Sequence, residues 1–593
     1  MAFKRGVALL LGLLGLAVLV SAAGMTMLYL MVGSGGSVPA NATLVVRPGA
    51  ELLELPSYDV LQLVQASDAH TIRGLVESLR KAKADARVRA VLLRPQAFES
   101  PFWAKVQELR DAIVDFRASG KPVVAFLEYG GNREYYLASA ADKVFLLPTA
   151  TLDLVGVANY ELFLRGTLDW VGTYPDLLHI GDYKTAVNTF TEKTMTPAHR
   201  EMAESLTRDQ YQQLVRAVAD GRRKSESDVR ALFDQGPFLP DEALRQGLVD
   251  ELAYEDELDD HVRELDGGND VRQIDVNDYA QVGWPSLGLT PRSRVAVIYA
   301  AGTIVSGRST YDPVNGPVLG ADTIIEHIRE ARADQQVKAI VLRVDSPGGS
   351  STASDMIWRE LTISKDVEPR RPLIVSMSDL AASGGYYIAM AGDVIVAEPG
   401  TLTGSIGIYT GKFVTGGTYD KLGANIESTS VGAHAEMYSP DRRFTPIERK
   451  KVMESMQAFY DQFVEKAADA RQTTPEKIDQ IAQGRVWTGE QARQVGLVDQ
   501  LGGLQVALAV AKQRANIPVD EEVELVIYPR RRTVYEALSE RLDDPVGTHS
   551  RAAAEALGAL LGTADRRAIS ALLAPARLFR SGEILAHMPY VFL

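Results

Sequence analysis

The chain carries the same series of segments twice, about 250 residues apart, and this internal repeat limits the folds open to it. Residues 88–94 (VRAVLLR) match residues 337–343 (VKAIVLR), and residues 121–125 (KPVVA) match residues 371–375 (RPLIV). These short runs are rich in β-branched and other apolar residues, which is typical of buried strands. A chain of 593 residues also exceeds what one hydrophobic core usually organises. The repeat therefore predicts two domains of one fold.

Two further pairs of segments extend the repeat towards the end of each copy. Residues 135–138 (YYLA) match residues 386–389 (YYIA). Residues 246–250 (QGLVD) match residues 494–499 (QVGLVD), with one inserted residue. Both copies therefore keep the same order of segments along most of their length.

Helical patterns lie between the predicted strands. Residues 321–334 and 447–470 carry apolar positions at three-to-four spacing with charged positions between them, as surface helices do. Strands that alternate with such helices indicate an α/β fold with a largely parallel sheet in each copy.

The N-terminus predicts a membrane anchor. Lys4 and Arg5 are followed by no charged residue until Arg47, and residues 7–32 are overwhelmingly apolar. A bilayer needs ~20 such residues, and the basic pair keeps the N-terminus cytoplasmic. A cleaved signal peptide is the alternative, because small residues at 21–23 (SAA) follow an apolar run. The apolar regions of signal peptides span ~7–15 residues, so the longer run favours an uncleaved signal-anchor.

Composition excludes several classes of function. The formal net charge of −14 argues against a general affinity for nucleic acid. The sequence has no phosphate-binding G-x-x-x-x-G-K-[ST] loop and no H-E-x-x-H metal motif. It has no cysteine, which removes thiol catalysis, disulfides and thiolate metal sites. We therefore expect neither a cofactor nor a metal.

Ser383 is the candidate nucleophile. It lies within residues 376–387 (SMSDLAASGGYY), where an apolar strand ends and a helix is predicted to begin. A serine at a helix N-terminus sits in a field that favours an alkoxide, and glycines allow substrate to approach closely. The alternative is that Ser383 only caps the helix. The first copy has residues 130–134 (GGNRE) at this place, so the serine is specific to the second copy.

A second glycine motif lies upstream of Ser383. Residues 343–350 (RVDSPGGS) end a strand in glycines, whereas the first copy has residues 94–98 (RPQAF). Glycines between a strand and a helix leave backbone N–H groups free to hold an oxyanion, as acyl transfer requires. A purely structural tight turn is the alternative interpretation.

Three motifs together carry a family resemblance. Residues 345–349 (DSPGG), 378–387 (SDLAASGGYY) and 402–407 (LTGSIG) occur in the order and spacing of the signal peptide peptidase A (protease IV) family, peptidase family S49. The chain resembles the long, two-repeat bacterial form from the anchor to about residue 515. The resemblance implies a tandem repeat of a crotonase/Clp-protease-like fold, a Ser–Lys dyad and a homotetramer.

The resemblance places the general base at Lys184, within residues 180–186 (IGDYKTA). When Thr196-Pro197 is aligned with Thr445-Pro446, residues 433–435 (AHA) of the second copy lie opposite Lys184, and they contain no lysine. The serine thus occurs in one copy and the lysine in the other, as one composite site requires. To act as a base, the lysine needs a pKa lowered from ~10.4 towards ~7–8, most simply by burial between the domains.

The remaining candidate residues assist this pair. The family has a serine that hydrogen-bonds the lysine, and Ser405 matches it; the first copy has Leu154 there. A simple turn serine is the alternative. Backbone amides of Gly348 and Gly349 are expected to hold the oxyanion.

Three other polar residues lie near these motifs or near the position that matches Lys184. Asp345 and Asp379 are interpreted as turn or cap residues, because a carboxylate beside the base would raise its pKa. His434 is a rival base, since it lies near the position that matches Lys184.

These features predict a membrane-anchored serine endopeptidase on the extracytoplasmic side of a bacterial cytoplasmic membrane. It would degrade cleaved signal peptides and similar apolar peptides. The alternatives are an inactive membrane scaffold that kept the peptidase fold and an acyl-CoA-processing enzyme on the crotonase fold. The expected partners are peptide substrates, membrane lipid and copies of the chain in a homotetramer, but not nucleic acid. The predicted segments are a cytoplasmic N-terminus (1–6), a signal-anchor (7–32), a linker (33–42), the first repeat (43–266), a linker (267–292), the second repeat (293–515) and a C-terminal tail (516–593).

Overall fold

The structure is a computed structural model that describes part of the chain. The described residues are 38–55, 71–265, 267, 271–312, 316–367, 370–530 and 583–588, together with residue 15. The predicted signal-anchor, 7–32, lies outside the described residues apart from residue 15. Within the described ranges, no helix has the length and apolar character needed to cross a bilayer.

The first repeat forms a six-stranded sheet in which every pair of neighbours is parallel. The strand order is β6-β4-β3-β2-β1-β7. The predicted strands at 88–94 and 121–125 are confirmed as β2 and β3. The strands are β1 (Ala42–Val46), β2 (Val88–Leu93), β3 (Val123–Leu127), β4 (Lys143–Leu146), β6 (Glu251–Leu252) and β7 (Arg272–Asp275).

The second repeat forms an eight-stranded sheet, parallel except for the β16–β18 pair. The order is β18-β16-β14-β12-β8-β20, with β15 pairing β14 and β19. Its edge strand β20 lies in the predicted tail, beyond residue 515. The strands are β8 (Ser293–Ala301), β12 (Val337–Ser346), β14 (Leu373–Ala382), β15 (Val394–Ala397), β16 (Leu402–Gly404), β18 (Val486–Thr488), β19 (Gln500–Leu501) and β20 (Val523–Tyr528).

A third sheet joins the two repeats, and the sequence pattern did not predict it. Its order is β10-β11-β9-β13-β21-β17-β5. The first-repeat strand β5 pairs antiparallel with the second-repeat strand β17 along seven residues. The strands are β5 (Tyr174–Ile180), β9 (Thr303–Val305), β10 (Thr310–Asp312), β11 (Gly316–Gly320), β13 (Gly348–Ser350), β17 (Ile408–Val414) and β21 (Leu585–His587).

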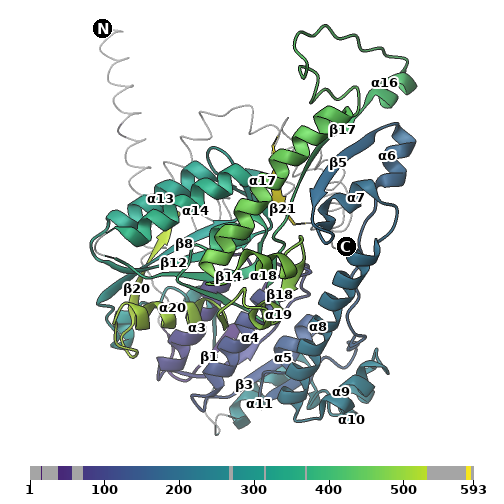
Figure 1. The fold of residues 1–593 in the computed structure, drawn as a ribbon. Helices are drawn as coiled ribbons and strands as arrows, with labels where there is room; N and C mark the ends of the chain where they lie inside the picture. Colours follow the sequence, from purple (N-terminus) through teal and green to yellow (C-terminus); the bar gives the residue numbers. More distant parts are fainter. Residues whose placement is uncertain are drawn as a thin grey trace, which may run out of the picture.

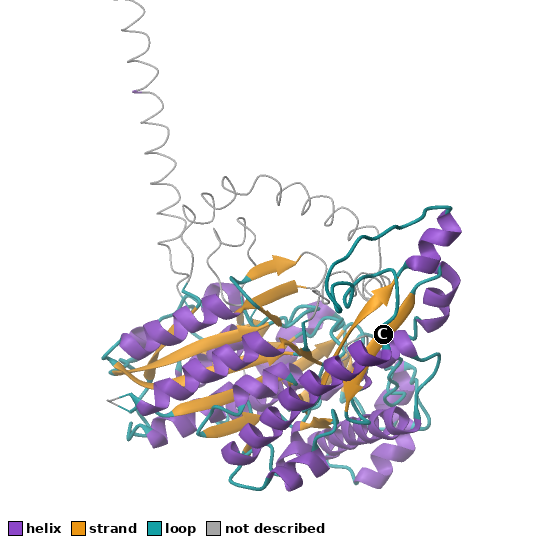
Figure 2. Ribbon diagram, turned by 45° about the horizontal axis from the view of Figure 1, so that its top comes forward, coloured by secondary structure: helices purple, strands orange, loops and turns teal. Residues whose placement is uncertain are grey.

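Helices cover the sheets, as Figures 1 and 2 show. The predicted helices at 321–334 and 447–470 are confirmed as α13 and α17. The longer helices are α3 (Ile72–Ala84), α4 (Ala104–Arg117), α8 (Pro197–Arg222), α13 (Ala321–Ala333), α14 (Ser351–Asp366), α17 (Pro446–Ala470) and α20 (Leu504–Arg514). The shorter ones are α5 (Asn132–Ala138), α6 (Arg165–Val171), α7 (Asn188–Thr191), α9 (Glu226–Phe233), α10 (Pro240–Arg245), α11 (Leu258–Leu265), α12 (Val276–Tyr279), α15 (Gly384–Ala389), α16 (Gly416–Leu422), α18 (Pro475–Ile481) and α19 (Gly489–Gln494), with 3-10 turns η1 (Thr185–Val187), η2 (Glu255–Glu257) and η3 (Trp284–Leu287).

The two long helices α8 and α17 begin in the same way, which explains their matching positions in the repeat. Thr196 and Thr445 are the N-cap residues, and each accepts a backbone hydrogen bond from the first turn. A proline follows at the first helical position, where its missing N–H costs nothing. In α17, Glu448 completes a capping box with Thr445.

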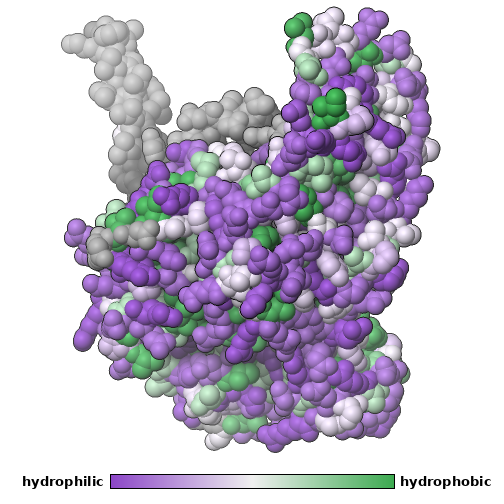
Figure 3. Space-filling model, viewed as in Figure 1, coloured by the Kyte–Doolittle hydropathy of each residue, from purple (hydrophilic) through white to green (hydrophobic). Residues whose placement is uncertain are grey.

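The sheets of both repeats are buried on both faces, which explains the nearly continuous apolar runs of their strands. In the first sheet, Leu44 and Val91 belong to one core cluster, whereas Val45 and Leu92 belong to the cluster on the other face. The face of the molecule in Figure 3 is mostly hydrophilic. The lobe that carries α6 and α16 departs from this, because Trp170, Leu422 and Val431 are exposed there.

Part of the predicted linker 267–292 is structured. It contains β7, which pairs with β1, followed by α12 and η3. The side chain of Asp275 accepts a hydrogen bond from Asn277 N, which caps α12. The sheet of the first repeat therefore includes β7, which lies beyond residue 266. A strand of this length is too short to show a strand pattern in sequence.

A buried ion cluster holds the two repeats together. Arg343 of β12 is 1 % exposed and lies 2.8 Å from Glu54 and 2.6 Å from Glu108, both of which precede the second repeat. Its guanidinium also donates to Ser376 and Ser378. Burial raises the pKa of Glu54, but the neighbouring Arg343 outweighs this and holds the pKa below its usual value.

Candidate active site

The turn between β14 and α15 presents Ser383. β14 ends at Ala382 and α15 begins at Gly384, and Ser383 between them has φ +55° and ψ −112°. This backbone conformation is strained for a residue with a side chain, and it is held by a hydrogen bond from Ser383 N to Gly404 O at 2.8 Å. The Ser383 side chain makes no capping hydrogen bond, so the interpretation as a simple helix cap is wrong.

Lys184 reaches Ser383 from the first repeat. It lies in the short loop after β5, immediately before the turn η1. Its Nζ lies 2.7 Å from Ser383 Oγ, 3.0 Å from Ser405 Oγ and 3.1 Å from the Ser405 carbonyl oxygen. The structure thus brings together three predicted residues from both repeats. Lys184 is 1 % exposed, so it is not a solvated surface lysine.

The environment of Lys184 favours a neutral amine. Desolvation by burial lowers the pKa of Lys184 well below its usual value, and no carboxylate of the described residues acts against this shift. A neutral lysine can accept a proton from a serine hydroxyl 2.7 Å away. The arrangement therefore supplies the chemistry of a general base beside a nucleophile.

The loop that contains Gly484 packs directly against the loop that carries Lys184. Gly484 has φ +81°, and a Cβ built on it would lie 2.4 Å from Lys184 N. Tyr183 N donates to Gln483 O at 2.9 Å, which fixes the two loops to each other. The approach of Lys184 thus requires glycine at 484, a residue that the sequence motifs did not single out.

Gly348 and Gly349 lie on β13 with φ of +99° and +155°. A Cβ at Gly348 would lie 2.6 Å from Gly384 N, and one at Gly349 would lie 2.0 Å from Ile304 O. Gly348 therefore packs directly against Gly384, the residue that follows Ser383. The Gly384 amide was not among the predicted oxyanion groups, although its position at the start of a helix was a usable signal.

Asp345 and Asp379 do more than shape turns. Lys105 of the first repeat places its Nζ 2.8 Å from Asp345 and 3.1 Å from Asp379. Asp345 also accepts a hydrogen bond from Leu380 N, and Asp379 accepts one from Lys105 N. Burial lowers the pKa of Lys105, but the two carboxylates outweigh this and raise it above its usual value. Lys105 therefore stays charged and joins the ends of β12 and β14, the strands that lead to Gly348 and Ser383.

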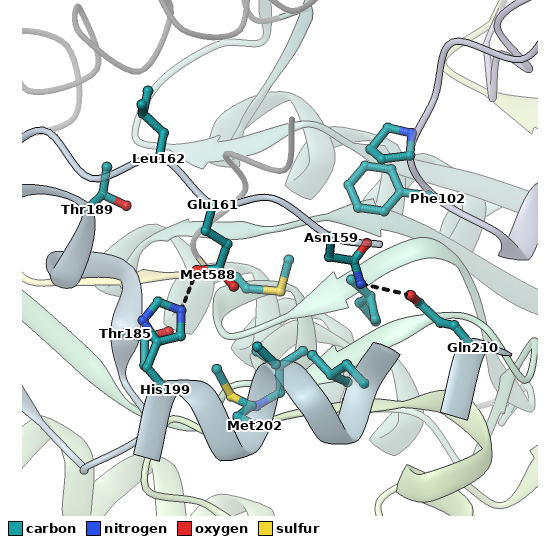
Figure 4. A pocket seen from close by; sticks show the side chains of 15 residues that line it. Phe102, Asn159, Glu161, Leu162, Thr185, Thr189, His199, Met202, Gln210 and Met588 are labelled. Carbon is teal, nitrogen blue, oxygen red and sulfur yellow. Dashed lines mark hydrogen bonds and ion pairs between the residues drawn. The ribbon is translucent and has the colours of Figure 1, made fainter. Parts of the chain in front are cut away.

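An apolar pocket adjoins the dyad, and Figure 4 shows its lining. Thr185, the neighbour of Lys184, forms part of its wall. One rim is polar: Glu161 pairs with His199, and Asn159 donates to Gln210. The apolar lining residues are Phe102, Leu162, Met202, Ala203, Leu206, Leu402, Val486 and Met588.

Two alternative chemistries find no support here. His434 is exposed in the loop between α16 and α17, whereas Lys184 is buried against Ser383. Among the described residues, no group of three or more His, Asp or Glu side chains could hold a metal ion.

Comparison with known proteins agrees with the repeat. The model of peptidase family S49 matches residues 115–269 and again residues 365–518. The chain is 37 % identical to "Serine protease SPPA, chloroplastic" of Arabidopsis thaliana, over 77 % of this chain and 68 % of that protein. It is 33 % identical to "Protease 4" of Salmonella typhi, over 89 % of this chain and 86 % of that protein.

A shorter relative and one solved structure complete the comparison. The chain is 33 % identical to "Putative signal peptide peptidase SppA" of Enterococcus faecium, over 32 % of this chain and 56 % of that protein. The TM-score to a ClpP1 mutant from Listeria monocytogenes is 0.24 at 13 % identity, over 36 % of this chain and 94 % of that one, which is too low to argue from. The family match in each repeat and the relatives along most of the sequence lead to one conclusion: the chain belongs to peptidase family S49.

Proposed function

We propose that the chain is a serine endopeptidase in which Ser383 is the nucleophile and Lys184 the general base. The observation that carries this proposal is the buried contact of 2.7 Å between Lys184 Nζ and Ser383 Oγ. The lowered pKa of Lys184 supports it, because the amine must be neutral to accept a proton. Each repeat supplies one member of the dyad.

The reaction proceeds in two halves. Ser383 Oγ attacks the scissile carbonyl carbon while its proton passes to Lys184 Nζ. The amides of Gly349 and Gly384 stabilise the oxyanion, whereas the Gly348 amide donates to Ser346 Oγ at 3.2 Å. Lys184 then gives the proton to the leaving amine as the peptide bond breaks. A water molecule, deprotonated by Lys184, hydrolyses the acyl-enzyme and restores Ser383.

Ser405 positions the base. Its hydroxyl and its carbonyl oxygen lie 3.0 and 3.1 Å from Lys184 Nζ, so they direct the lone pair of the amine towards Ser383. Ser405 has φ +49°, and its N–H donates to Arg485 O at 2.7 Å, which fixes this orientation. The role is that of a positioning residue.

We propose apolar peptides, in particular cleaved signal peptides, as substrates. The name of the Enterococcus faecium relative suggests this class, and the apolar pocket beside Lys184 supports it. Leu206 and Leu402, which both line this pocket, would bury an apolar side chain of the peptide.

The predicted topology belongs to the same proposal. A signal-anchor at 7–32 would hold the active site just outside a bacterial cytoplasmic membrane, where apolar peptides are released. We also propose the homotetramer. The exposed Trp170 of α6 and Leu422 of α16 support it, because large apolar side chains on the surface of two contacting helices are typical of interaction sites. Light scattering of the Trp170→Glu/Leu422→Glu variant would report a smaller assembly.

The central test compares Ser383→Ala and Lys184→Ala with the wild type on a fluorogenic apolar peptide. Both variants are expected to lose at least ~10³-fold in kcat/KM with folding intact. Lys193→Ala is the matched control, because that first-repeat lysine is 68 % exposed. Activity that survives Lys184→Ala but not His434→Ala would refute the dyad. A wild type that neither cleaves peptides nor reacts with a serine-directed probe would favour the scaffold, and tight binding of coenzyme A would favour the crotonase alternative.

A further inference from the structure

The C-terminal segment Glu583–Met588 lies inside the third sheet, between β13 and β17 (Figure 1). Its strand β21 runs antiparallel to β13, with His587 opposite Gly348 and Leu585 opposite Ser350. Backbone hydrogen bonds extend this pairing at both ends, from Met588 N to Pro347 O at 2.8 Å and from Ser351 N to Ile584 O at 3.1 Å. The segment is thus a full member of the sheet that carries the oxyanion glycines.

The other edge of the segment contacts β17. Leu585 lies opposite Tyr409 in antiparallel register. Thr410 Oγ1 donates to the carbonyl oxygen of Glu583 at 2.6 Å. The segment therefore fills the gap between two strands that would otherwise leave backbone groups unpaired, and an extended peptide is the ligand that such a gap accepts.

The segment also covers the dyad. A Cβ built on Gly348 would lie 2.1 Å from the carbonyl oxygen of Ala586, and one built on Gly384 would lie 3.0 Å from it. Ala586 thus packs against the glycines on both sides of the nucleophile turn. With the segment in place, Ser383 is 0 % exposed, so a second peptide cannot reach it.

His587 lies close enough to Lys184 for the two groups to interact. It is 4 % exposed, and burial lowers its pKa to about 3. The imidazole is therefore neutral, because a buried cation at this place would cost more. The segment therefore meets both members of the dyad, through Ala586 and His587.

Three apolar side chains anchor the segment. Met588 is 0 % exposed and packs in the pocket of Figure 4 against Met202, Leu402 and Val486. Leu585 is 2 % exposed and packs with side chains of the first repeat, and Ala586 is fully buried. Side chains in pockets combined with backbone pairing are how peptides bind by strand addition.

We propose that the strip between β13 and β17 is a peptide-docking surface whose occupant is the chain's own segment Glu583–Met588, which holds the enzyme in a self-inhibited form. This inference rests on the proposed function. Because the segment is tethered, its effective concentration is of the order of mM, and a substrate peptide must compete with it. A tethered segment with an intrinsic Kd of ~10–100 µM would raise the apparent KM ~10–100-fold.

The first experiment displaces the segment within the full-length chain. In the Ala586→Arg/Met588→Asp variant, charged side chains cannot enter sites that are 0 % exposed. The KM for an apolar peptide is expected to fall ~10-fold or more with kcat unchanged. A synthetic peptide of the sequence EILAHM should then inhibit the variant competitively. Val519→Asp is the matched control, because that apolar side chain is 88 % exposed. An unchanged KM in the displaced variant would overturn the inference.

The second experiment locks the segment in place. The chain has no cysteine, so the pair Tyr409→Cys/Leu585→Cys would form a single disulfide between two Cα partners. The oxidised protein is expected to lose activity, which a reductant should restore, and each single substitution serves as a control. Full activity of the oxidised, verified disulfide would overturn the inference.

A binding measurement separates this inference from the proposed function. In a Ser383→Ala background, a fluorescent EILAHM peptide should bind the displaced variant and fail to bind the unmodified chain. If no variant cleaves peptides but this difference in binding is present, the proposed function fails and the docking surface stands. If peptides are cleaved but the two chains bind the probe equally, the function stands and the docking surface fails.

Discussion

The amine of Lys184 and the hydroxyl of Ser383 lie 2.7 Å apart, although 199 residues separate them in sequence. Their contact depends on the third sheet, in which β5 of the first repeat pairs with β17 of the second. Within the part of the chain that the structure describes, neither side chain has a carboxylate partner that would keep the amine charged. The geometry and the lowered pKa of the lysine lead to predictions that can be measured separately.

Peptidase activity should rise with pH and reach its plateau well below the ~10.4 of an ordinary lysine. Below its lowered pKa, Lys184 is protonated and cannot accept the proton of Ser383. The measurement is kcat/KM for an apolar peptide between about pH 5 and pH 10. A profile whose midpoint coincides with the pKa of a solvated lysine would contradict the assignment of Lys184 as base.

The same pKa shift affects stability. Because the pKa of Lys184 is lowered by folding, the unfolded chain binds more protons between the folded pKa and ~10.4, and stability rises with pH in that window. Lys184→Met should remove this contribution, so the variant gains most stability relative to wild type below the folded pKa. Urea unfolding at several pH values tests this, with the exposed Lys193→Met as control. Equal pH dependence in wild type and Lys184→Met would contradict burial of the amine.

Gly484→Ala should reduce kcat by ~10–100-fold, because its Cβ would lie 2.4 Å from Lys184 N and displace the base. Gly423→Ala is the matched control. Both glycines have positive φ, but a Cβ at Gly423 meets no atom within 4 Å. The two variants therefore share the backbone strain and differ only in the contact with Lys184. Similar kcat values for both would show that Gly484 does not position the base.

Lys105→Met should lower kcat more than it changes KM, because it removes the link between the ends of β12 and β14, which lead to Gly348 and Ser383. It also leaves Asp345 and Asp379 buried without their cation, which costs about 3–5 kcal/mol. The combined Lys105→Met/Asp345→Asn/Asp379→Asn variant should recover much of the stability but not kcat. If the combined variant recovered both its stability and its kcat, Lys105 would have only a structural role.

Arg343→Met should destabilise the chain by about 3–5 kcal/mol, because it leaves the carboxylates of Glu54 and Glu108 buried between the repeats without their cation. Arg294→Met removes an ion pair at the surface, with Glu524 52 % exposed, and should change the stability far less. Thermal or urea unfolding measures both. Equal losses would show that the buried cluster does not hold the repeats together.

The sequence predicted the elements that have a local or repeated pattern. The strands β2, β3, β12 and β14 and the helices α13 and α17 follow from apolar periodicity. Ser383, Lys184 and Ser405 were singled out by comparing the two copies and by the family motifs, and the structure brings them together. Their catalytic roles stay predictions until the variants are tested.

Contacts between distant segments were not predictable, because they leave no periodic trace. The pairing of β5 with β17, the fit of Gly484 against Lys184 and the insertion of β21 depend on three-dimensional packing alone. Lys105 looked like any helical lysine, since nothing near it in sequence indicates Asp345 or Asp379. The tail at 516–593 was predicted as one segment, but β20 and β21 belong to two different sheets.

The fit of Gly484 against the backbone of Lys184 has a consequence for biosynthesis. Ribosomes synthesise a chain from its N-terminus to its C-terminus, so Lys184 and Ser383 are made well before Gln483 and Gly484. The loop that presses the amine towards the hydroxyl is absent from the nascent chain during that interval. The contact between the amine and the hydroxyl is therefore expected to form only after most of the second repeat has been translated.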